Sequence, residues 1–253
     1  MRWGSFVAVG DSFSEGLDDP DPAGGGFRGW ADLVAAALAG RREGFGYANL
    51  AIRGRLFHRV VDEQVPAALA MRADLVSFAA GGNDVLRRRF DPAALVARLD
   101  ATVASLRDAG ADVLLFRFAD VTARLPGRRL IGPRAELLNR AVADVAGRHR
   151  ALLVDVAADP EFDNPALWSV DRLHLSAAGH RRVAAHVLSA LGVEPDPAWW
   201  RAEPPPARRS WPAARAADLA WAGRHLAPWV RRRITGRSSG DLLIPKRPSL
   251  GPL

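Results

Sequence analysis

The stretch "SFVAVGDSFSEG" at residues 5–16 joins an apolar run of strand length to a polar turn. Its apolar part does not alternate with polar residues, which is typical of a strand buried on both faces of a parallel sheet. Ser12 follows the strand directly, and functional groups of such sheets gather at the carboxyl ends of the strands. The stretch therefore predicts a buried first strand that carries a hydroxyl group to the sheet edge.

Strand-like and helix-like segments continue to alternate through the first 190 residues. Further apolar runs of strand length lie at 45–52, 73–82, 111–118 and 151–157. Helical patterns lie at 29–40, 55–71 (bent or restarted at Pro66), 91–110, 134–149 and 176–191. This alternation predicts an α/β fold in which a five-stranded parallel sheet carries helices on both faces.

Composition limits the class of protein. The chain has 253 residues, of which 49% are hydrophobic and 25% charged, as in ordinary globular proteins. There is no cysteine, which excludes disulfides and cysteine-based metal sites. The N-terminus lacks the apolar region of a secretory signal, and no run approaches the roughly 20 apolar residues of a membrane span. We therefore expect a cytoplasmic protein.

The positive charge is concentrated at the C-terminal end. Residues 1–200 hold 24 arginines and 25 acidic residues, whereas residues 201–253 hold ten arginines, one lysine and three acidic residues, a net charge of +8. Such an asymmetry indicates a boundary. We predict a body over 1–195 and a Trp- and Arg-rich extension over 196–253.

Four separated segments carry polar residues or glycine to the ends of predicted strands or to the start of the last body helix. They are "VGDSFSEG" (9–16), "NLAIRGR" (49–55), "GGNDV" (81–85) and "DRLHLSAAGH" (171–180), and they contain Ser12, Gly54, Asn83, Asp171 and His174. Each of these residues alone could be an ordinary turn or cap residue. Their meeting at one sheet edge favours catalysis.

Together the five residues form a complete set for acyl transfer. A serine is a weak nucleophile that needs an adjacent base, which His174 could supply, and Asp171 could hold the imidazole in the right tautomer. The amides of Ser12 and Gly54 and the side chain of Asn83 are suitable donors to an oxyanion.

The four segments resemble the sequence blocks of the SGNH hydrolases, also called GDSL esterases or lipases, over roughly residues 4–191. The resemblance implies a flavodoxin-like three-layer α/β/α sandwich and metal-independent ester hydrolysis. It also implies Ser12 as nucleophile, His174 as base, Asp171 as its partner, and Ser12, Gly54 and Asn83 as the oxyanion hole. Phe13 stands where the family name has leucine, and we expect that position to tolerate an apolar exchange.

Other polar residues receive structural interpretations. Asp11 is interpreted as a residue that ties the nucleophile turn to a neighbouring loop. His180 and His186 lie inside the last body helix and are interpreted as packing or surface residues. His58, His149 and His225 show no partner pattern, so the sequence predicts no metal site and no cofactor.

The motif "GRSSG" (236–240) matches the G-x-S-x-G pattern of a nucleophile elbow. That motif needs a strand before it and a histidine after it, whereas an Arg-rich helical pattern precedes it and no histidine follows residue 225. We therefore interpret it as a flexible turn.

The extension contains five of the eight tryptophans and a helical pattern at about 212–234 that breaks at Pro228. The helix could pack on the body with solvated arginines, or it could present a basic, Trp-bearing surface for weak contact with anionic lipid or for an acidic partner. No recognised module supports nucleic-acid binding. Residues 238–253 are expected to be mobile or draped on the body.

The sequence thus favours a serine esterase that hydrolyses a carboxylic ester of a lipid or an acylated small molecule or carbohydrate through an acyl-enzyme on Ser12. Two alternatives stay open: an acyltransferase with the same residues, and a non-catalytic lipid- or carbohydrate-binding protein. The expected partner is a small-molecule acyl ester, and no pattern assigns an oligomeric state.

Overall fold

Six strands form one sheet at the centre of the protein, in the order β5-β4-β3-β1-β2-β6. The computed structural model describes residues 2–207, 210–235 and 238–253, apart from the side chain of residue 233. The strands are β1 (Ser5–Gly10), β2 (Gly46–Asn49), β3 (Leu75–Ala79), β4 (Asp112–Arg117), β5 (Leu152–Asp155) and β6 (Arg247–Pro252). The first five pair in parallel and β6 is antiparallel to β2.

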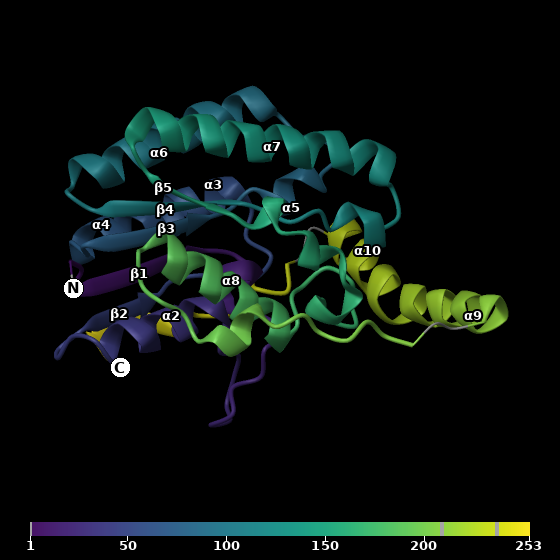
Figure 1. Cartoon of the computed structure of the whole chain (residues 1–253). Helices are drawn as coiled ribbons and strands as arrows, with labels where there is room; N and C mark the ends of the chain where they lie inside the picture. The colour runs from purple at the N-terminus through teal and green to yellow at the C-terminus, as the bar shows by residue number, and fades with distance from the viewer. Residues whose placement is uncertain (1, 208–209, 236–237) are drawn as a thin grey trace.

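Helices cover both faces of the sheet (Figure 1). The longer ones are α2 (Gly29–Ala39), α6 (Pro92–Asp108), α7 (Arg128–His149), α8 (Ala177–Ala190), α9 (Trp211–Trp221) and α10 (Ala227–Ile234). The shorter ones are α1 (Ser12–Glu15), α3 (Phe57–Arg59), α4 (Val65–Met71) and α5 (Gly82–Val85). Within the described ranges, no helix combines the length and the apolar character needed to cross a bilayer.

Two separate apolar cores result from the alternation of side chains along the strands. Phe6 and Ala8 of β1 point into the core beneath α2 and α8, whereas Val7 and Val9 point into the core beneath α6 and α7. All four are fully buried. The predicted layering, with strands that are apolar on both faces, is therefore confirmed.

The predicted number of strands is wrong, because the sheet has six rather than five and is not purely parallel. The sixth strand, "RPSLGP", lies in the C-terminal stretch that we expected to be mobile or draped. Two prolines and a glycine conceal it in the sequence, but proline is tolerated on an edge strand where its missing N–H faces no partner. The final residues thus extend the edge beyond β2.

Two helical segments contain a π turn just before a proline. The predicted helix over 55–71 is α3, a π turn (Val60–Gln64) and α4, with Pro66 near the start of α4. The predicted helix at about 212–234 is α9, a π turn (Ala222–Leu226) and α10, with Pro228 near its start. A proline cannot donate to the preceding turn, which accounts for the change of register in both places.

Lys246 fixes the extension to the body just before β6. Its Nζ donates to the carbonyl oxygens of Glu15 (2.6 Å), Phe27 (3.1 Å) and Arg28 (2.6 Å) and to the carboxylate of Asp32. The side chains of Lys246 and Asp32 are only 22% and 19% exposed. The division into two domains near residue 195 stays a prediction, but the extension returns to the sheet at this point.

We predict that Lys246→Met lowers the free energy of unfolding by about 2 kcal/mol, because it leaves the Asp32 carboxylate half-buried without its cation. Urea unfolding of the purified protein measures the change. Adding Asp32→Asn to Lys246→Met should recover part of the loss, since no unpaired charge remains. A loss that is the same with and without Asp32→Asn would contradict this interpretation.

Candidate active site

The turn after β1 holds Ser12 at the edge of the sheet. Asp11 caps α1 by accepting a hydrogen bond from the Phe13 N–H at 3.1 Å. Gly16 ends α1 with φ +89°, and a Cβ on Gly29 would lie only 2.2 Å from the Gly16 Cα. Only two glycines permit this approach. The contact locks α1 against the start of α2 and fixes the position of Ser12.

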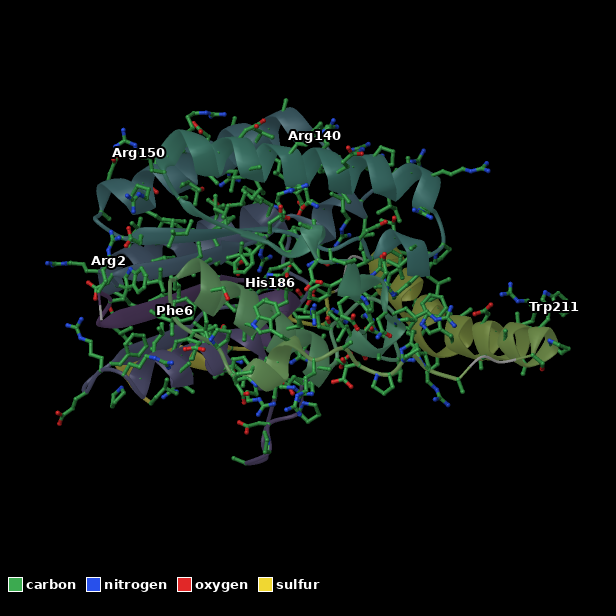
Figure 2. The ribbon with its side chains drawn as sticks, viewed as in Figure 1. Arg2, Phe6, Arg140, Arg150, His186 and Trp211 are labelled. Atoms are coloured by element: carbon green, nitrogen blue, oxygen red, sulfur yellow. The ribbon has the colours of Figure 1, made fainter. Side chains whose placement is uncertain are left out.

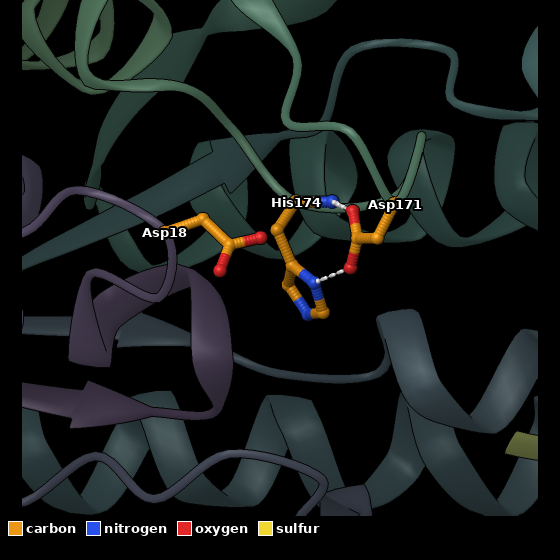
Figure 3. A group of neighbouring side chains, drawn as sticks. All are labelled: Asp18, Asp171 and His174. Carbon is orange, nitrogen blue, oxygen red and sulfur yellow. Dashed lines mark hydrogen bonds and ion pairs between the residues drawn. The ribbon is translucent and has the colours of Figure 1, made fainter. Parts of the chain in front are cut away.

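The loop before α8 presents Asp171 and His174. Asp171 Oδ1 accepts hydrogen bonds from the N–H groups of Leu173 and His174, each at 2.9 Å, which fixes the carboxylate. Its Oδ2 lies 2.5 Å from His174 Nδ1 (Figure 3). His174 Nε2 lies 3.0 Å from Ser12 Oγ. The structure therefore brings Ser12, His174 and Asp171 into one chain of hydrogen bonds.

The charges around the imidazole favour its protonated form. Burial lowers the pKa of His174, but the hydrogen bond and charge of Asp171, with smaller effects of Asp18 and Asp11, outweigh it and raise the pKa above its usual 6.5. Burial raises the pKa of Asp171, but the hydrogen bonds from His174 and Leu173 lower it to about 2. Asp171 is thus ionised at any pH at which the imidazole titrates.

Asp18 is a site residue that the sequence analysis missed. A carboxylate oxygen of Asp18, one of Asp171 and a ring nitrogen of His174 lie within 4.8 Å of one another (Figure 3). Three such groups could hold a metal ion, but both ring nitrogens already have hydrogen-bond partners, which favours proton transfer over ligation. Asp18 has φ +70°, a conformation that aspartate tolerates better than most residues.

Gly54 and Asn83 both reach the same site. Gly54 has φ +72° and lines a cavity together with Ser12, Asn83 and His174. In the described part of the chain, no acceptor bonds the N–H groups of Ser12 and Gly54. The Asn83 side chain differs, because its Nδ2 donates to Asp11 Oδ2 at 3.0 Å and to the Arg55 carbonyl at 3.1 Å.

We expected Asp11 to tie the nucleophile turn to a neighbouring loop, and its carboxylate does so by accepting the hydrogen bond from Asn83. Burial raises the pKa of Asp11 to about 6, while the Phe13 N–H, the charge of His174 and the Asn83 amide oppose the increase.

The side chains of three of the other histidines have hydrogen-bond partners. His180 is buried, accepts from the Trp30 N–H at 3.3 Å through Nδ1 and lies 3.1 Å from the Leu17 carbonyl through Nε2. Burial lowers its pKa to about 4. His186 pairs with Asp159 on the surface of α8. His149, for which the sequence showed no partner, pairs with Asp100.

Two cavities meet at Ser12 and His174. The larger one, of about 710 Å³, is lined mainly by apolar side chains. Phe13 forms part of its wall and contacts Trp30, Phe116 and Phe118 with ring centroids 5.3 to 5.6 Å apart. The smaller one, of about 390 Å³, lies between the body and α9–α10. Ser12 is thus flanked by an apolar chamber and a second, more polar one.

The extension contacts the loop that holds Asp171. Trp221 Nε1 donates to the Asp171 carbonyl oxygen at 3.1 Å. Arg172 pairs with Asp218 at 2.8 Å and stacks on the Trp221 ring, 4.6 Å from its centroid. No sequence pattern revealed these contacts, because each joins residues about 50 positions apart.

The extension also contacts the Gly54 loop. A Cβ on Gly240 would lie 2.1 Å from the Arg53 carbonyl oxygen, and a Cβ on Gly54 would lie 2.2 Å from Ser238 Oγ. Residues 236–237 of the motif "GRSSG" lie outside the described residues. Ser238 follows α10 rather than a strand, and its Oγ accepts from the Gly240 N–H at 3.3 Å. This placement is unlike that of a nucleophile elbow.

Comparisons with known proteins agree with this arrangement. The GDSL-like lipase/acylhydrolase family matches residues 8–182. Among solved structures, the acetylxylan esterase Axe2 from Geobacillus stearothermophilus is 21% identical with a TM-score of 0.63 over 80% of this chain and all of that one. LAE5, an α/β hydrolase from the metagenome of Lake Arreo, is 24% identical with a TM-score of 0.62 over 75% of this chain and 95% of that one.

A third solved structure, TesA, is 29% identical with a TM-score of 0.57 over 74% of this chain and 97% of that one. No curated protein matches the chain. Because the family match spans more than half of the sequence, this protein belongs to the GDSL-like lipase/acylhydrolase family and is a carboxylic ester hydrolase.

Proposed function

We propose that the protein hydrolyses carboxylic esters through an acyl-enzyme on Ser12, with His174 as general base and Asp171 as its orienting partner. The single observation that supports this proposal is the continuous contact from Ser12 Oγ to His174 Nε2 (3.0 Å) and from His174 Nδ1 to Asp171 Oδ2 (2.5 Å). Catalytic mutants of the acetylxylan esterase Axe2 likewise replace a serine and an aspartate.

The reaction has two halves. Ser12 Oγ bonds to the acyl carbon while His174 Nε2 takes the hydroxyl proton, and the same proton then passes to the leaving alcohol as the ester C–O bond breaks. Water repeats the sequence in the second half: it gives a proton to His174, attacks the acyl carbon and releases the acid, and Ser12 regains its proton. Asp171 stays ionised throughout and stabilises the imidazolium.

The backbone N–H groups of Ser12 and Gly54 are the donors that can hold the negative oxygen of the tetrahedral intermediate without losing another bond. Asn83 Nδ2 can join them only by sharing a hydrogen bond now made to Asp11 or to the Arg55 carbonyl. We therefore assign the two backbone groups as the main donors and Asn83 as a third.

The apolar cavity beside Ser12 is suited to the acyl half of the substrate. Its volume of about 710 Å³ is within the range of pockets that enclose small organic ligands. Phe13, Phe118, Phe162 and Trp168 are among its lining residues. Such walls favour an aliphatic acyl chain longer than acetyl.

Replacing Ser12 by alanine should reduce kcat on p-nitrophenyl butyrate by at least about 10⁴-fold, because the nucleophile is lost while the fold is kept. Ser189→Ala, an exposed change on α8, is the matched control and should keep full activity. A fluorophosphonate should label the wild type and Ser189→Ala but not Ser12→Ala. Labelling of Ser12→Ala at the same position would contradict the assignment.

The pH dependence of kcat/KM should show an acid limb above pH 6.5, since only neutral His174 can accept the proton and its pKa is raised. Asp18→Asn removes a negative charge that favours the imidazolium. The pKa should therefore fall and the acid limb should move to lower pH. Asp144→Asn, exposed on α7, is the control. A limb that does not move in Asp18→Asn would argue against electrostatic contact between Asp18 and the base.

Activity should increase with acyl length in the p-nitrophenyl series from acetate to octanoate. Each added CH₂ that enters the apolar cavity contributes about 0.8 kcal/mol, or about fourfold in kcat/KM. Initial rates at substrate concentrations well below KM measure the trend. A maximum at acetate would show that this cavity does not take the acyl chain.

A further inference from the structure

The smaller cavity beside Ser12 has walls from two parts of the chain. The body contributes Ser12, Gly54 and Asn83, and α9, α10 and the π turn between them contribute the opposite wall. Its lining includes Trp221, Arg224, His225, Trp229 and Arg232 from the extension. The family match ends at residue 182, so the wall that the extension supplies lies outside the matched region.

This cavity is lined by more cations than carboxylates. Arg87, Arg224 and Arg232 line it, and within the described ranges no carboxylate oxygen lies within 4 Å of any of their nitrogens. Arg53 also lines it but is paired with Glu15. Among the residues that the structure describes, Asp171 is the one carboxylate in this lining, and His174 and two backbone N–H groups already engage it.

Arg87 lines the cavity without an ion-pair partner among the described residues. Its Nε is buried and has no hydrogen-bond partner in the part of the chain that the structure describes. A partly buried guanidinium without an ion-paired carboxylate is costly, and an anion in the cavity would offset its charge. Arg224 and Arg232 are exposed, and they differ from ordinary solvated arginines in lining the same cavity as Ser12 and His174.

The geometry of ester cleavage assigns a role to this cavity. The acyl carbon bonded to Ser12 carries the acyl chain on one side and the leaving oxygen on another. If the acyl chain occupies the larger, apolar cavity, the alcohol half lies in the other space that opens at Ser12 and His174, which is the smaller cavity. His174, which lines both cavities, is then placed to protonate the leaving oxygen.

We propose that the C-terminal extension forms a binding subsite for the alcohol half of the substrate, and that this alcohol carries a phosphate group. The inference rests on the function proposed above. A phosphate dianion matches three arginines that lack an ion-paired carboxylate in the described residues better than a single carboxylate does, because it carries nearly two charges and offers three acceptor oxygens. The substrate class is therefore an aliphatic ester of a phosphorylated alcohol.

The test compares three esters with the same acyl group: 1-hexanoylglycerol, its 3-phosphate, and the hexanoyl ester of glycerate. We expect kcat/KM to be at least about tenfold higher for the phosphate than for the neutral ester, with the carboxylate between them. The preference should decrease as salt rises, because the subsite is open to solvent.

Variants that remove a positive charge show which arginines cause the preference for the phosphorylated ester. Replacing Arg224 and Arg232 together by glutamine should lower the phosphate-to-neutral ratio about tenfold. Arg231→Gln is the control, because it removes a charge next to Arg232 on α10 from a residue that lines a separate groove rather than the catalytic cavity. The ratio should not change in Arg231→Gln. An equal fall in both variants would indicate a general surface field and would overturn the subsite.

Failure of this inference and failure of the proposed function give different results. Hydrolysis of the neutral ester that depends on Ser12, together with no preference for the phosphate, refutes the subsite and leaves the esterase intact. Calorimetric titration of Ser12→Ala with the neutral ester and its phosphate tests binding without turnover. Equal dissociation constants there would overturn the subsite whatever the activity, and a tighter constant for the phosphate that is lost on adding the Arg224 and Arg232 changes would support it.

Discussion

The contact between Ser12 Oγ and His174 Nε2 joins positions that are 162 residues apart, and the arrangement of the other site residues depends on it. A hydrogen bond of this kind needs both partners placed to within a few tenths of an ångström. The parallel sheet provides the frame, because β1 fixes the turn at Ser12 and β5 and α8 bracket the loop of His174. The two loops are held in different ways. Gly16 against Gly29 fixes one, and the Asp171 carboxylate bonded to two N–H groups fixes the other.

The extension imposes a second constraint on the same loops. It leaves the body after α8, passes over the carboxyl ends of the strands as α9 and α10, and returns to the sheet as β6 (Figure 1). Trp211 lies at its outer tip, far from the sheet (Figure 2). Between these points Trp221 bonds the Asp171 loop and Gly240 packs against the Arg53 carbonyl. The extension therefore touches both the acid–base loop and the loop of the Gly54 N–H, and Lys246 holds its far end.

Sequence reasoning could predict the first five strands and the side chains that meet at Ser12 because the signals of each segment are local. An apolar run before Ser12, or an aspartate three residues before His174, can be read within a few positions. The β6 strand could not be predicted from "RPSLGP", because its pairing is with β2, some 200 residues away. The proximity of Asp18 to His174 was also missed, because these residues are far apart in the sequence and come together only in the folded chain. The hydrogen bonds of Asn83 could not be predicted either, because its side-chain amide donates to Asp11 and to the Arg55 carbonyl, which only the fold brings close to it.

The charges divide the site into two halves on either side of Ser12. Asp171, Asp18 and Asp11 lie around the imidazole, and their charges raise the pKa of His174, which favours its protonated form. A site with only these carboxylates would repel an anionic substrate. Arg87, between α5 and α6, and Arg224 and Arg232 of the extension line the smaller cavity and can offset that repulsion there. Without the extension, the protein would keep the carboxylates around His174 but lose most of the arginines that line the smaller cavity. The charges of the extension and those around His174 therefore belong to one electrostatic arrangement.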